Sequence, residues 1–142
     1  MYHSLRAEWP CLSFDVLRDA GGDNRVRFPL SMLLVCGTQA DAPEKNKVTL
    51  LKLSDMHRTH AGEGSDDEDD DEHLDEDPSI DHVHMPHMGG VNRLRSMPQN
   101  PGIVATMADA RQVHIFDASA VFQVDLDLCH STVRHPIHLR HL

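Results

Sequence analysis

The first half of the chain alternates short apolar runs with polar turns. Residues 11–17 (CLSFDVL) alternate small or polar side chains with bulky ones, as β-strands do when one face is buried. Residues 30–38 (LSMLLVCGT) form one apolar run of strand length, and residues 47–54 (KVTLLKLS) alternate at their start. Turn-forming residues at 21–24 and 43–46 lie between these runs. The pattern therefore predicts three strands joined by loops.

The second half repeats this arrangement less clearly. Residues 89–98 (GGVNRLRSMP) alternate, with Val91 and Arg93 expected on one face. Residues 103–109 (IVATMAD) and 111–119 (RQVHIFDAS) are shorter strand patterns separated by a turn. Both halves therefore show the order strand, turn, strand, turn, strand. Repeats of about 40 residues with three or four strands are typical of propeller blades, so we predict an all-β fold.

A segment of different composition separates the two halves. Residues 62–78 (GEGSDDEDDDEHLDEDP) contain eleven acidic side chains and no Lys or Arg. Like charges at this density repel, and little apolar surface is present to offset the entropy of ordering, so disorder is expected. We predict a first repeat with its N-terminal segment in 1–59, the acidic insert in 60–79, a second repeat in 80–119 and a divergent, poorly ordered tail in 120–142.

Charge is concentrated in this insert. The formal net charge is −10, from 13 basic and 23 acidic residues. Eleven of the acidic residues lie in 63–77, which leaves 13 basic and 12 acidic residues in the remainder. The chain is therefore a nearly neutral scaffold with one acidic insert. Arg93 and Arg95 are too few to form the basic stripe that direct nucleic-acid binding needs.

The compartment follows from the cysteines and from the absence of apolar segments. Cys11, Cys36 and Cys129 are far apart in the sequence and odd in number, which favours reduced thiols, with Cys11 and Cys36 as small buried residues. No apolar run approaches the roughly 18–20 residues of a membrane span, and the first ten residues lack a signal-peptide core. We therefore expect a soluble protein of the cytosol or nucleus.

Catalytic and metal-binding chemistry finds little support. The sequence has no Gly-x-Ser-x-Gly and no phosphate-binding loop, and carboxylates in a disordered insert cannot be held in position for acid–base work. His82 and His84 would share one strand face, with His87 close behind. A structural zinc site needs four ligands, however, and no cysteine pair accompanies these histidines. We expect no enzyme activity, no metal and no cofactor.

Several motifs together resemble the glutamate-rich WD-repeat protein family. They are EWPCLSFDVLRD, FPLSMLLVCGTQAD, NKVTLLKLSDM and, beyond the acidic insert, HMGGVNRLRSMPQNPGIVAT with VHIFD, in order over about residues 4–118. That family is similar to the histone-binding WD-repeat subunits of chromatin-assembly complexes. The resemblance implies a β-propeller in the nucleus and nucleolus that acts without enzyme activity, in assembly of the large ribosomal subunit or in histone binding. A substrate adaptor of a cullin-type ubiquitin ligase is the alternative.

The chain departs from the family pattern in two ways. Phe116-Asp117 stands where a WD repeat often has Trp-Asp. Only two repeats are recognisable, and an open pair of blades leaves strand edges unpaired. We therefore expect a partial propeller of about two blades, and either a fragment that keeps some binding function or a truncated product without function.

The acidic insert is the candidate functional site. A polyanionic arm would collect a basic client such as a ribosomal protein or a histone, through an attraction that salt weakens. A solvated loop that merely tolerates charge is the other explanation. Ser65 precedes acidic residues and is a candidate for phosphorylation, which would add a charge of about −1.5 to −2. The residues assigned to the client are Asp66, Asp67, Glu68, Asp69, Asp70, Asp71, Glu72, Asp75, Glu76 and Asp77.

Overall fold

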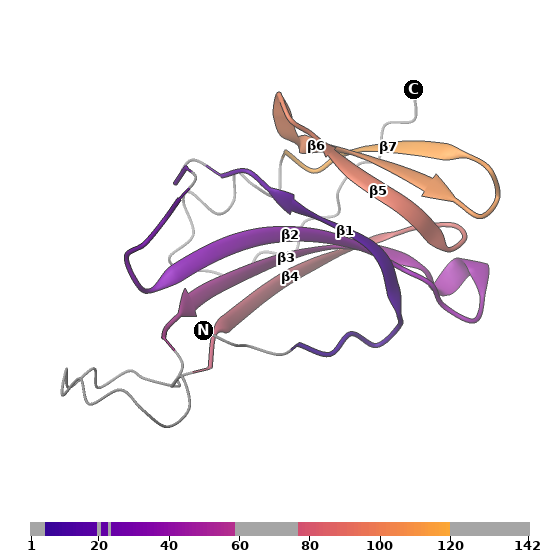
Figure 1. The fold of residues 1–142 in the computed structure, drawn as a ribbon. Coiled ribbons are helices and arrows are strands. Elements are labelled where there is room, and N and C mark those ends of the chain that lie inside the picture. The colour runs from indigo at the N-terminus through magenta and orange to yellow at the C-terminus, as the bar shows by residue number, and fades with distance from the viewer. Residues whose placement is uncertain (1–4, 20, 23, 59–76, 120–142) are drawn as a thin grey trace.

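The computed structural model describes residues 5–19, 21–22, 24–58 and 77–119. These residues form two antiparallel β-sheets, with one short 3₁₀ turn, which confirms the predicted all-β fold (Figure 1). No helix in this part of the chain has the length and apolar character needed to cross a bilayer. The expected disorder of the insert and of the tail concerns residues that mostly lie outside the described ranges.

The first sheet contains four strands in sequence order. They are β1 (Cys11–Leu17), β2 (Leu30–Thr38), β3 (Lys47–Met56) and β4 (Ser79–Pro86). The 3₁₀ turn η1 (Pro43–Lys45) connects β2 to β3. The sequence predicted β1 and β2 with their observed bounds, and β3 continues two residues beyond its predicted end.

The second sheet contains three strands, again in sequence order. They are β5 (Val91–Met97), β6 (Asn100–Ala108) and β7 (Val113–Asp117). β6 begins earlier than predicted because Asn100 already pairs with Met97, so the turn of this hairpin consists only of Pro98 and Gln99. The segment expected to be a longer turn is therefore largely part of the strand.

β4 is the main difference from the sequence prediction, which assigned residues from 80 onward to the second repeat. It pairs antiparallel with β3 along its whole length, from Ser54 opposite Ser79 to Lys47 opposite Pro86. β4 therefore completes the first sheet, and the acidic insert connects two neighbouring strands of one sheet. The pattern hid this strand because Met85 is its one buried residue.

The start of β5 also departs from simple alternation. Val91 and Leu94 are both fully buried, whereas Arg93 is exposed. A shift of register between Val91 and Arg93 inserts one additional residue into the strand. The prediction that Val91 and Arg93 share a face was therefore wrong, because the bulge reverses the alternation at this point.

The hydrophobic core lies between the two sheets. Its members come from both sheets and exclude water from the space between them. β1 and β5, the inner edge strands, run side by side where the sheets meet (Figure 1). The buried core residues are Leu17, Val35, Val48, Leu50, Met85, Val91, Leu94, Val104, Phe116 and Ala118.

Polar side chains of β1 connect the two sheets along this contact. The Ser13 hydroxyl accepts a hydrogen bond from the Leu94 amide at 3.0 Å and lies 3.4 Å from the Leu94 carbonyl oxygen. The Asp15 carboxylate accepts from the Ser96 amide at 2.9 Å and from the Ser96 hydroxyl at 3.0 Å. Burial opposes ionisation of Asp15, but these bonds and the charge of Arg95 outweigh it and lower the pKa of the carboxyl group.

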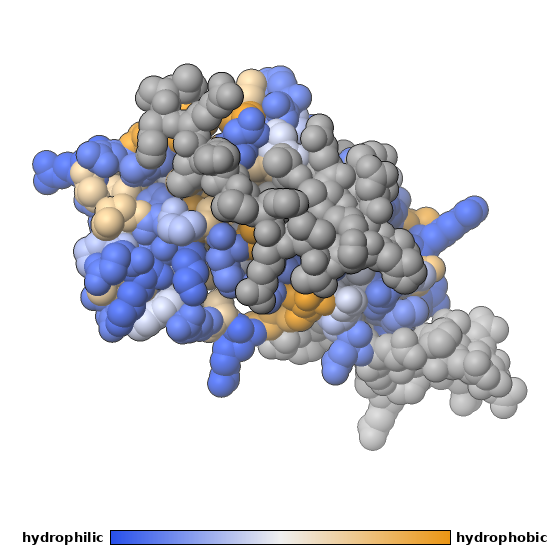
Figure 2. All heavy atoms as spheres, turned by 180° about the vertical axis from the view of Figure 1, so that it is seen from behind, coloured by the Kyte–Doolittle hydropathy of each residue, from blue (hydrophilic) through white to orange (hydrophobic). Residues whose placement is uncertain are grey.

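Apolar side chains also remain on the outer faces of the two sheets. Phe14 and Val16 on β1 are 63% and 54% exposed, and Val113 and Ile115 on β7 are 64% and 57% exposed. In the described part of the face shown in Figure 2, hydrophilic side chains dominate and hydrophobic ones form small groups between them. Within the described residues, each sheet is thus covered well on one face only.

Gly37 tests how closely the two sheets must approach. A Cβ atom at this position would overlap the Val91 side chain of the opposite sheet. We expect Gly37→Ala to lower the free energy of unfolding by about 1–3 kcal/mol, because core overpacking forces backbone shifts. Urea unfolding measures the effect.

The matched control is Gly21→Ala, where the added atom meets only the flexible side chain of Arg25. It should change the free energy of unfolding much less. Equal losses for the two variants would contradict the close approach of the sheets.

Candidate functional site

The acidic insert begins and ends at one edge of the first sheet. Ser54 and Ser79 form the last pair between β3 and β4, and the chain leaves β3 through Asp55, which has a left-handed backbone with φ of 54°. Asp77 is exposed at the return point. The other predicted site residues lie outside the described ranges; they are Ser65, Asp66, Asp67, Glu68, Asp69, Asp70, Asp71, Glu72, Asp75 and Glu76.

The described residues at the base of the insert continue its acidic character. Asp55, Asp77 and Asp81 are all exposed there. Two basic residues lie nearby. Lys52 is opposite Asp81 in the β3–β4 pair, and the Arg58 guanidinium lies 5.1 Å from the centre of the Phe28 ring. The base therefore presents carboxylates to solvent beside cations that already have neighbours.

The opposite end of the first sheet is held by a buried amide. Asn46 is only 2% exposed, and its side-chain oxygen accepts a hydrogen bond from the Ala40 amide at 2.7 Å. Its side-chain nitrogen donates to the carbonyl oxygens of Ala42 and Pro43. Because it satisfies three backbone groups of the β2–β3 connection, Asn46 fixes the path of that turn. The sequence placed Asn46 outside the strands but did not predict its burial.

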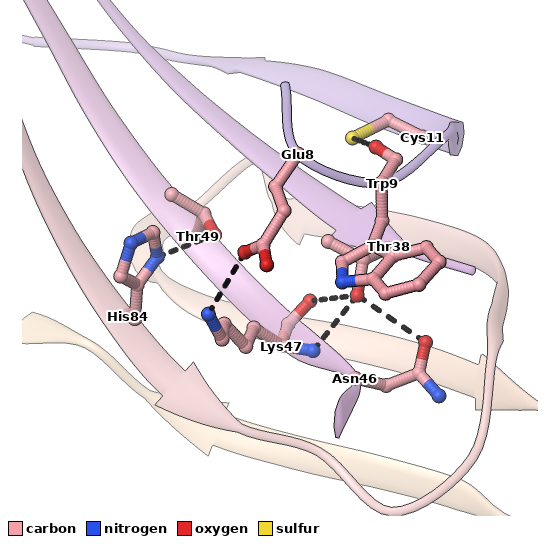
Figure 3. A network of polar contacts seen from close by, with 8 residues as sticks. All are labelled: Glu8, Trp9, Cys11, Thr38, Asn46, Lys47, Thr49 and His84. Carbon is pink, nitrogen blue, oxygen red and sulfur yellow. Dashed lines mark hydrogen bonds and ion pairs between the residues drawn. The ribbon is translucent and has the colours of Figure 1, made fainter. Parts of the chain in front are cut away.

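The N-terminal segment docks at this same end (Figure 3). Lys47 Nζ lies 3.5 Å from Glu8 Oε2, and Lys45 Nζ lies 5.7 Å from the centre of the Trp9 ring. Thr49 and His84 form a hydrogen bond of 2.9 Å across β3 and β4. Exposed ion pairs contribute little stability, so these contacts position the segment more than they hold it.

A buried histidine joins the two sheets at the entry to β5. His87 is 4% exposed, and its Nδ1 donates to the Gly89 carbonyl oxygen at 2.9 Å. Its Nε2 therefore accepts from the Thr106 hydroxyl, also at 2.9 Å. The ring packs against Phe116 and meets His114 edge to face. Burial, the strongest influence, lowers the pKa of His87.

These contacts decide the fate of the histidines considered as metal ligands. Both ring nitrogens of His87 are used in hydrogen bonds, so neither is free to bind a metal. His82 and His84 do share the exposed face of β4, with ring centres 4.8 Å apart. Among the described residues, no group of three or more His, Cys, Asp or Glu side chains is placed to hold a metal ion.

Known proteins share both the sequence of this framework and its order. Residues 1–57 match the family model of the histone-binding protein RBBP4, a component of the CAF1 complex. Over 82% of its length, the chain is 43% identical to glutamate-rich WD repeat-containing protein 1 of Dictyostelium discoideum. It is 37% identical over 82% of its length to ribosome assembly protein rrb1 of Schizosaccharomyces pombe. The chain belongs to the glutamate-rich WD-repeat family.

The two sheets are those of a partial WD-repeat propeller, as this family membership implies. The chain covers 27% and 25% of the two relatives, so it spans about a quarter of the length of the glutamate-rich WD-repeat proteins that it matches. A shorter stretch, 25% of the chain, is 51% identical to histone acetyltransferase type B subunit 2 of Schizosaccharomyces pombe.

The buried His87 predicts a pH dependence of stability. Because its pKa is lower in the folded chain than the ordinary value of 6.5, the unfolded chain takes up more protons as the pH falls. The free energy of unfolding should therefore decrease as the pH falls from 6.5 through the folded-state pKa of His87. The pKa of His84, which burial also lowers, adds a contribution of the same sign.

His87→Gln, which does not titrate, should flatten this dependence. The control His82→Gln removes an exposed histidine and should keep the slope. Urea unfolding between about pH 5 and 8 measures both variants. The same slope in His87→Gln as in the unmodified chain would rule out His87 as its origin.

Proposed function

We propose that this chain is part of a non-enzymatic scaffold that holds basic proteins during assembly of the large ribosomal subunit, during histone handling, or in both. The observation that carries the proposal is the distribution of charge. Eleven acidic residues and no basic residue occupy 63–77, whereas the rest of the chain has 13 basic and 12 acidic residues. The scaffold itself thus contributes little net charge, and the insert presents nearly all of it.

The position of the insert supports this role. Its two ends enter neighbouring antiparallel strands, β3 and β4, whose pairing continues for eight residues away from the insert. The charges therefore emerge from one point at the edge of a sheet and do not interrupt the core. Many like charges attract a Lys- and Arg-rich partner over a range of about 8–10 Å at moderate salt.

The relatives supply the class of client. The matching family model is named for histone binding, and one relative is named a ribosome assembly protein. Histones and ribosomal proteins are both strongly basic and both must be kept from nonspecific contacts with nucleic acid. We therefore place this chain in the nucleus, with the nucleolus as the site of its ribosomal role.

Ser65 adds a means of regulation to this proposal. It lies directly before the run that starts at Asp66. A phosphate there would add a charge of about −1.5 to −2 to the arm and strengthen its attraction for a basic client.

Neutralising the insert tests the proposal. Changing the aspartates of 66–71 to Asn and Glu68 to Gln should weaken binding of purified core histones about tenfold or more at low salt. It should also reduce the steepness with which affinity falls as salt is added, because fewer charges take part. Fluorescence anisotropy at several salt concentrations gives both values.

A second variant, with the residues of 63–77 in a different order, serves as the matched control. It keeps every charge, so it should bind histones as the unmodified chain does. If the neutral variant keeps both the affinity and the salt dependence, the arm is only a solvated loop.

A further inference from the structure

Two cysteines that are distant in sequence meet on the first sheet. Cys36 lies in β2 between Val35 and Gly37, which face the second sheet, so Cys36 faces away from it. Cys11 is opposite Thr38, two residues further along the same face of β2. The register therefore makes Cys11 and Cys36 diagonal neighbours on adjacent antiparallel strands.

The irregular start of β1 favours a short distance between the two sulfur atoms. The register between β1 and β2 shifts between Cys11 and Ser13, which marks a bulge and a locally stronger twist. Cys11 Sγ lies 3.7 Å from the Trp9 carbonyl oxygen, to which it donates. Burial and the nearby Cys11 thiol, which also shares a hydrogen bond with it, raise the pKa of Cys36 to about 12.

Both thiols are also reachable from solvent. The sequence predicted two small buried residues, but Cys11 and Cys36 are each partly exposed, and both are free thiols in this structure. A buried cysteine is inert, whereas a partly exposed pair on one sheet face can react with small disulfides. The prediction of burial was wrong because it treated each residue alone and could not see that both face outward.

We propose that Cys11 and Cys36 form a reversible dithiol–disulfide site that reacts with low-molecular-weight disulfides such as oxidised glutathione. The thiolate of Cys11 attacks one sulfur of glutathione disulfide and releases one glutathione thiolate. The thiolate of Cys36 then attacks the Cys11 sulfur and releases the second glutathione. The two protein thiols lose two protons and two electrons, and one glutathione disulfide becomes two glutathione molecules.

The order of attack follows from the surroundings of the two thiols. Since the pKa of Cys36 is about 12, Cys36 carries little thiolate at neutral pH and acts second, on a sulfur that is already beside it. The closing step should become faster by about tenfold for each unit of pH over the neutral range, in proportion to the thiolate fraction.

Closing this bond would tie the first strand to its neighbour where the N-terminal segment enters the sheet. Cys11 lies two residues after Trp9, the one tryptophan of the chain. The bond would remove the contact of the Cys11 thiol with the Trp9 carbonyl oxygen. Trp9 fluorescence therefore reports the reaction at the site itself, independently of the acidic insert.

The test uses the full chain with Cys129→Ser, so that Cys11 and Cys36 are its two cysteines. After incubation in mixtures of reduced and oxidised glutathione, maleimide labelling counts free thiols and intact mass shows what has formed. We expect labelling to fall from two thiols to none, with a mass lower by two hydrogen atoms and no added glutathione. Reduction should restore both the labelling and the Trp9 fluorescence.

Two matched variants separate this outcome from simple thiol oxidation. Cys11→Ser and Cys36→Ser each keep one thiol, so each can hold glutathione but cannot expel it. The proposal predicts a stable glutathione adduct on Cys11 in the Cys36→Ser variant and none in the parent. A parent chain that stays reduced, that retains glutathione on both cysteines, or that links two chains would overturn it.

Discussion

The contact between β1 and β5 is the constraint on which the rest of this structure depends. Each of these strands is the inner edge of its sheet, so its outward-facing amide and carbonyl groups have no neighbouring strand in that sheet. Ser13 and Asp15 supply the missing partners for the backbone of Leu94 and Ser96. The apolar core between the sheets can then close without leaving these polar groups unsatisfied, which would cost about 1–3 kcal/mol for each group. Loss of the alignment along β1 would disturb the core and the edge together.

The parts of this fold that could be predicted are those whose residues are apolar in a regular pattern. β1 and β2 were predicted with their observed bounds because both contribute to the core and end at polar turns. β4 was missed because an outer edge strand needs few apolar residues, and Met85 alone is buried in it. The bulge at Val91 was missed because it depends on how β5 packs against Gly37 and not on the sequence of β5 alone.

The candidate site was predictable in composition and not in place. The acidic run is evident from residues 63–77, but its connection of β3 to β4 depends on the return strand that the pattern concealed. His87 was considered as a metal ligand from its neighbours in sequence, whereas its real partners, Thr106 and Phe116, come from the second sheet. Such pairings arise only from the folded arrangement, because no local signal connects residues so far apart.

The location of the insert within a single hairpin has a consequence for how such a protein can change over time. The two ends of the insert enter strands that lie about 4.8 Å apart, and this separation does not depend on how many residues lie between them. Doubling the length of the insert costs only about 0.6 kcal/mol in loop entropy. Mutation can therefore lengthen, shorten or recharge the arm while the sheet beneath it is preserved. The strength of attraction for a client and the stability of the fold are thus free to evolve separately.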